Sequence, residues 1–117
     1  MTNAVQAASW AYVTYDSGTR ANWYIDKSDV HYKGNLLCFT AQAVHDNVNA
    51  NGYKAMIASY EVEGGNPARA RVVAIAFLDG VGNILNFAEE PDSDQWIDIP
   101  PGTIGYEVTK YAVQYAR

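Results

Sequence analysis

Hydrophobic and polar residues alternate along most of this chain with the two-residue period of β-strands. The alternation is clear over residues 53–63, where Met56, Ala58 and Tyr60 would face one way and Ser59 and Glu61 the other. Turns rich in glycine, asparagine and aspartate separate the alternating segments. The pattern predicts six strands, over residues 9–15, 20–26, 36–44, 53–63, 69–78 and 84–88, with the second bending at 26–28 before 30–32.

The pattern changes after Pro100 and Pro101, which cannot continue a strand ladder. Thr103 can cap a following helix, and the apolar residues after it share one helical face. These residues are Ile104, Val108, Tyr111, Ala112 and Tyr115. A strand over 106–113 is the alternative, since Gly105 and β-branched residues weaken the helix. Short connections favour antiparallel pairing. We therefore predict an α+β fold, with an antiparallel sheet of about six strands and a C-terminal helix packed on one face.

The predicted strand over 69–78 is the most apolar of the six, and residues 72–78 are apolar on both faces. Such a strand is expected in the middle of a sheet, with cover on each side. One helix supplies cover for one face only. The remaining face predicts packing against a second copy, as a two-fold homodimer.

Composition fits one folded domain, which we place at residues 10–117 of the 117-residue chain. The net charge of −5 and the scattered basic residues argue against binding of nucleic acid or other polyanions. Arg69 and Arg71 are the closest basic pair, and we expect them to form a solvated strand start. Cys38 is the only cysteine, which excludes an internal disulfide, and its apolar neighbours predict a buried, inert thiol.

Residues 1–9 are predicted to be a flexible N-terminus or the remnant of a signal peptide. Val5-Gln6-Ala7 before Ala8 provides the short side chains that a signal peptidase reads. No stretch is long and apolar enough for a transmembrane helix. The working prediction is a secreted, periplasmic or cell-surface protein.

No arrangement of residues meets the requirements of a catalytic, cofactor or metal site. His31 and His45 lack a ligand partner at metal-binding spacing, and Ser28, Asp29 and His31 lack the glycine-flanked nucleophile turn of a hydrolase. The acidic loop containing Glu89, Glu90, Asp92 and Asp94 is interrupted by Pro91, so it is not a calcium loop. We predict no enzyme activity, no cofactor and no metal.

Aromatic residues on the predicted strands are the remaining candidates for recognition. They are Trp10, Tyr12, Trp23, Tyr24, Tyr53, Tyr60 and Trp96. Such residues form core or cross-strand pairs when buried and a recognition surface when exposed. The sequence leaves both readings open.

Several of these segments together resemble the surface-adhesin protein E family of bacterial envelope proteins. The likeness covers about residues 10–116. It rests on the Trp10 strand, Trp23-Tyr24-Ile25-Asp26, the Gly34 hairpin, the turn over 79–83, and Trp96-Ile97-Asp98-Ile99-Pro100-Pro101-Gly102-Thr103. The resemblance implies an envelope protein with an antiparallel sheet and a C-terminal helix. The best-known kind of member is a lipid-anchored dimer that binds host proteins such as laminin, vitronectin and plasminogen.

The chain departs from the family pattern in its cysteines. Many relatives carry a cysteine pair between the fifth-strand region and the helix, where this chain has Ala70, Arg71 and Tyr115, Ala116. A lipid-attachment cysteine near residue 1 is also absent. The prediction is a non-catalytic surface adhesin or protein-binding domain that recognises extracellular host or envelope proteins, with no binding residue assigned. An envelope structural module and a binder of small lipid or glycan ligands are the alternatives.

Overall fold

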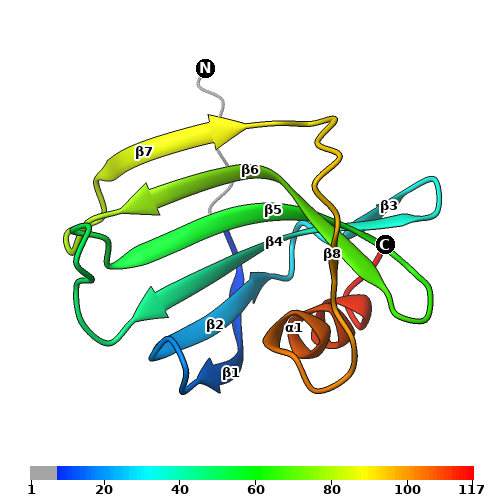
Figure 1. Ribbon diagram of the computed structural model, residues 1–117, viewed down its shortest axis with the longest axis horizontal. Helices are drawn as coiled ribbons and strands as arrows, with labels where there is room; N and C mark the ends of the chain where they lie inside the picture. Colours follow the sequence, from blue (N-terminus) through cyan, green and yellow to red (C-terminus); the bar gives the residue numbers. More distant parts are fainter. Residues whose placement is uncertain (1–7) are drawn as a thin grey trace.

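The computed structural model describes residues 8–117 and contains one antiparallel sheet followed by a helix (Figure 1). The strands are β1 (Trp10–Asp16), β2 (Ala21–Asp26), β3 (His31–Lys33), β4 (Leu36–His45), β5 (Ala55–Glu63), β6 (Arg69–Leu78), β7 (Ile84–Glu89) and β8 (Ile97–Asp98), and the helix is α1 (Ile104–Val113). The predicted α+β class is confirmed. Residues 1–7, which hold most of the predicted N-terminal segment, lie outside the described residues.

The main strand order is β1-β2-β4-β5-β6-β7, and the two short strands β3 and β8 pair with β4 and β6. The segment 41–45 of β4 pairs with β2, and the segment 36–38 pairs with β3, so β2 and β3 lie along the same side of β4. In the same way, β8 pairs with Arg69 and Ala70, and β7 pairs with residues 74–78 of β6. The predicted bend after residue 26 is therefore confirmed, while β8 was not predicted.

The helix begins where the sequence places it. Thr103 is the N-cap, and its hydroxyl oxygen accepts a hydrogen bond from the Tyr106 backbone N–H at 3.2 Å. Glu107 lies in the first turn and Lys110 in the last, and this order matches the helix dipole. The alternative of a strand over 106–113 is wrong.

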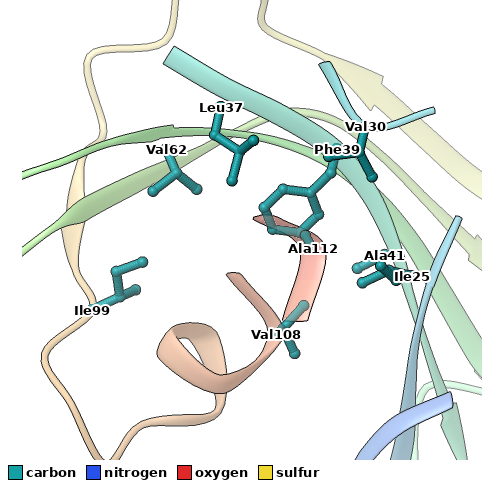
Figure 2. Packing of buried hydrophobic residues seen from close by; sticks show 9 residues of the cluster. All are labelled: Ile25, Val30, Leu37, Phe39, Ala41, Val62, Ile99, Val108 and Ala112. Carbon is teal, nitrogen blue, oxygen red and sulfur yellow. The ribbon is translucent and has the colours of Figure 1, made fainter. Parts of the chain in front are cut away.

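The core lies between α1 and one face of the sheet. Figure 2 shows nine of its residues, from β2, β4, β5 and α1 and from the segments before β3 and α1: Ile25, Val30, Leu37, Phe39, Ala41, Val62, Ile99, Val108 and Ala112. Ile25 and Val30 are fully buried, and Phe39 packs against Tyr60 with ring centroids 5.6 Å apart. The core fixes which strand residues face the helix and which face away.

A β-bulge interrupts the alternation of β6. Tyr60 pairs with Val72, and Ser59 pairs with Ala74, so Val73 has no partner on β5. Arg71 and Ala74 therefore point to the same face although they are three residues apart. Every residue of β6 is only half-buried, so the predicted cover on both of its faces is not met within one chain.

Candidate functional site

The sheet face away from the helix, here called the open face, carries a row of side chains across six strands. Successive partners in the strand register give the row Tyr12, Tyr24, Gln42, Ile57, Ala76 and Phe87. Directly paired residues project on one side of a sheet, so these side chains are neighbours. A second row of paired residues beside it contains Tyr15, Asn22, Val44, Ala55, Leu78 and Ile84. This half of the open face is therefore largely apolar and aromatic.

Strand β7 forms one edge of the sheet and is exposed along its whole length. Its three large apolar residues, Ile84, Leu85 and Phe87, are 65%, 50% and 56% exposed. The outer side of such a strand presents backbone N–H and C=O groups to an incoming strand. Exposed apolar side chains next to free backbone groups form a surface suited to protein binding.

The other half of the open face is charged, with the carboxylate of Glu61 at its centre. Glu61 is 5% exposed and accepts hydrogen bonds from Arg71 Nε at 2.9 Å and Arg71 Nη2 at 2.6 Å. Lys33 Nζ forms an ion pair with the second carboxylate oxygen of Glu61. Burial alone would raise the pKa of Glu61, but the hydrogen bonds from Lys33 and Arg71 outweigh it and hold the pKa below its ordinary value.

Arg71 also fastens the segment between β7 and β8 to the sheet. Its Nη1 donates to the Ser93 carbonyl oxygen at 2.6 Å, and its guanidinium lies 4.7 Å from the centre of the Trp96 ring. Arg69 lies 4.9 Å from the same ring and pairs with Glu63. The prediction of a solvated arginine pair is wrong for Arg71, whose side chain is 15% exposed, because the register of β5 and β6 places Glu61 beside it.

The aromatic candidates divide between the two faces of the sheet. Trp23 and Tyr60 pack against the core, and burial raises the pKa of Tyr60 to about 12. Tyr12 and Tyr24 meet edge to face on the open face with ring centroids 5.5 Å apart, and Tyr12 is 50% exposed. Tyr53, just before β5, stacks on Phe77 of β6 with ring centroids 4.5 Å apart. Only part of the aromatic set therefore belongs to an accessible surface.

The residues weighed for catalysis do not assemble into a catalytic group. The Ser28 hydroxyl donates to Asp26, while His31 Nδ1 lies 3.7 Å from Asp29. His45 lies in β4, and its Nδ1 is 3.2 Å from the Thr19 carbonyl oxygen. Cys38 is buried, as predicted, and burial raises the pKa of its thiol.

Residues 8–117 also bear on metal binding and on membrane spanning. Within this range, no three His, Cys, Asp or Glu side chains come together as a metal site. The carboxylates of the acidic loop are exposed and spread out along it. No helix in the described part of the chain has both the length and the hydrophobicity to cross a membrane.

The charged cluster could not be found from sequence spacing alone. Glu61 and Arg71 are ten residues apart and come together only through the β5–β6 register. By contrast, the exposed row on β7 follows from apolar residues in a short strand next to a turn. Its position at the edge of the sheet could be found only from the strand order.

Comparisons of the chain with protein-family models, curated proteins and solved structures find no match. The family resemblance therefore stays a prediction. The surfaces of the molecule itself are the basis for proposing its function.

Proposed function

We propose that this protein is a non-catalytic binding domain, exported to the cell surface or envelope, that recognises other proteins through its open face and β7 edge. The observation that carries the proposal is the exposure of all six residues of β7, with Ile84, Leu85 and Phe87 at least half exposed. Proteins seldom present a contiguous row of apolar side chains to water unless a partner covers it. Tyr12 and Tyr24 extend the same face with aromatic anchors, which are enriched at binding hot spots.

The partners expected from the resemblance are extracellular proteins, and they define the first experiment. Biolayer interferometry with immobilised laminin, vitronectin and plasminogen tests the wild-type protein and Phe87→Ser. Val113→Ser is the matched control, because Val113 is 48% exposed but lies on the helix. We expect at least one partner to bind, with binding weakened about tenfold or more by Phe87→Ser and unchanged by Val113→Ser. Equal binding by both variants would place the interface elsewhere.

A second copy of the chain is the other partner that we propose. β6 is half-buried on both faces, so face-to-face packing of two sheets about a two-fold axis would cover one of them. Light scattering at tens of micromolar should then give twice the 12.9 kDa chain mass. Phe87→Lys, in the open-face row, should return the mass to that of one chain. A monomeric wild-type protein at that concentration rejects the dimer.

The location of the protein separates a host-binding adhesin from a module of the bacterial envelope. Protease treatment of whole cells, followed by mass spectrometry of the mature N-terminus, tests exposure and processing together. Accessible protein beginning near Ala8 supports export to the surface. Protected protein beginning at Met1 contradicts the proposed export and directs the search for partners to the cell interior.

A further inference from the structure

A small apolar pocket, here called the helix pocket, lies between α1 and the sheet, apart from the open face. Its volume is about 120 Å³, and its lining includes Trp23, Phe39, Tyr60, Ala70, Ile99 and Val108. Three of the lining residues, Phe39, Ile99 and Val108, are labelled in Figure 2 among the core residues between the helix and the sheet. These residues come from β2, β4, β5, β6, α1 and the segment just before α1, so the walls are fixed by the core of the fold.

Two small residues shape this space. Ala70 fills little of the volume above β6, and Gly105 has no side chain on the first turn of α1. A Cβ atom at Gly105 would lie 2.9 Å from Ile99 Cγ2, so glycine lets the helix approach the Ile99 wall closely. The pocket therefore follows from particular residues at particular positions in the helix and the strand.

The pocket reaches the surface beside β8. Ile97 borders it and is 63% exposed, so a ligand can enter without opening the core. Three of the lining side chains, Trp23, Phe39 and Tyr60, are aromatic. Aromatic rings favour the edges and faces of another ring at centroid distances of about 4.5–7 Å.

The lining contains no charged side chain that is free to pair with an ion. Arg71 borders the pocket, but its guanidinium is held on the open face by Glu61 and by the Ser93 carbonyl oxygen. Tyr60 is protonated at physiological pH. An ion moved into this space would lose its hydration without gaining a partner of opposite charge.

We propose that the helix pocket is a binding site for an uncharged ligand, or part of a ligand, the size of a single aromatic ring. Apolar cavities of about 150 Å³ in other proteins stay dry and bind benzene, so a volume of this order suffices for one ring. The site is independent of the protein-binding surface proposed above, because none of the residues named in its lining belongs to the open-face rows.

NMR spectroscopy of the isotope-labelled protein tests the proposal, with toluene as the probe and benzoate as its charged counterpart. The Trp23 indole N–H is a suitable reporter, since it is buried and has no hydrogen-bond partner among the described residues. We expect saturable shifts of the Trp23 indole and Val108 amide signals with toluene, at millimolar affinity as befits a ligand of so few atoms. Benzoate should bind at least tenfold more weakly.

Filling the pocket provides the matched variants. Ala70→Leu should weaken toluene binding at least tenfold, and Ala70→Val, a smaller change, about threefold. Ala74→Leu is the control on the same strand, because Ala74 pairs with Ser59 on the open face, and it should bind as the wild type does. If toluene gives no saturable shift up to its solubility limit, the proposal is wrong. The same holds if benzoate binds equally, or if both Ala70 variants fold and bind like Ala74→Leu.

Discussion

Removal of the Arg71 charge should cost far more stability than removal of the neighbouring Arg69 charge. The side chains of Arg71 and Glu61 are 15% and 6% exposed, so Arg71→Met leaves a buried carboxylate with fewer partners. Breaking a buried ion pair from one side costs about 3–5 kcal/mol. Since Lys33 still contacts Glu61, we expect the lower end of that range, about 3 kcal/mol.

The assay is urea unfolding followed by far-UV circular dichroism at pH 7. Arg69→Met is the matched control, because Arg69 lies about as close to Trp96 but pairs with Glu63 where both side chains are 40% or more exposed. An exposed pair of this kind contributes less than about 1 kcal/mol. The double variant Glu61→Met, Arg71→Met removes both charges and should recover most of the loss.

The two arginine variants distinguish a buried ion pair from a general effect of positive charge. If Arg71→Met and Arg69→Met lose equal stability, the burial of Glu61 has no energetic consequence and the reasoning is refuted. A double variant no more stable than Arg71→Met alone would also contradict it, since the loss would then come from the Ser93 and Trp96 contacts of Arg71.

Three further predictions concern pH, the Trp96 ring and the helix cap. The Glu61 pKa lies below its ordinary value of 4.5, so the contribution of the Glu61 carboxylate to stability is complete above pH 4.5 and is lost as the pH falls through the folded-state pKa. The unfolding free energy, measured as a function of pH, should show this fall, and the fall should be smaller in Arg71→Met. Trp96→Ala should lower the free energy of unfolding in urea by about 1–2 kcal/mol, since the ring is half-buried against two arginines and lies outside the core cluster. A loss above about 4 kcal/mol would mean that the ring belongs to the core. Thr103→Ala should cost about 1 kcal/mol, whereas Thr103→Ser should be nearly neutral; equal losses would exclude the cap.

The elements that the sequence predicted are those specified by local signals. Thr103 after two prolines, followed by a helical apolar face, marks the start of α1 because capping and proline chemistry act within a few residues. The alternation of Tyr60, Glu61 and Val62 likewise gives the correct faces of β5. Local chemistry and tertiary structure agree at these places.

The features that the sequence did not predict depend on contacts between distant segments. β8 consists of two residues and exists because it pairs with the beginning of β6. The buried position of Arg71 follows from a strand register that no spacing rule provides. The helix pocket depends on the small side chain of Ala70 and on the close contact between Gly105 and Ile99, and both matter only once the helix and sheet are in place.

The unpaired Val73 of β6 also bears on which changes in chain length the fold tolerates. Val72 faces the helix and Ala74 faces the open face. Deletion of Val73 would therefore restore regular alternation and leave all the remaining side chains of β6 on their present faces. Deletion of Ala76 instead would move Phe77 and Leu78 to the opposite faces. A chain one residue shorter at the bulge loses the backbone hydrogen bond from Glu90 to Val73 but keeps both surfaces, so homologous chains are expected to differ in length here rather than elsewhere in the strand.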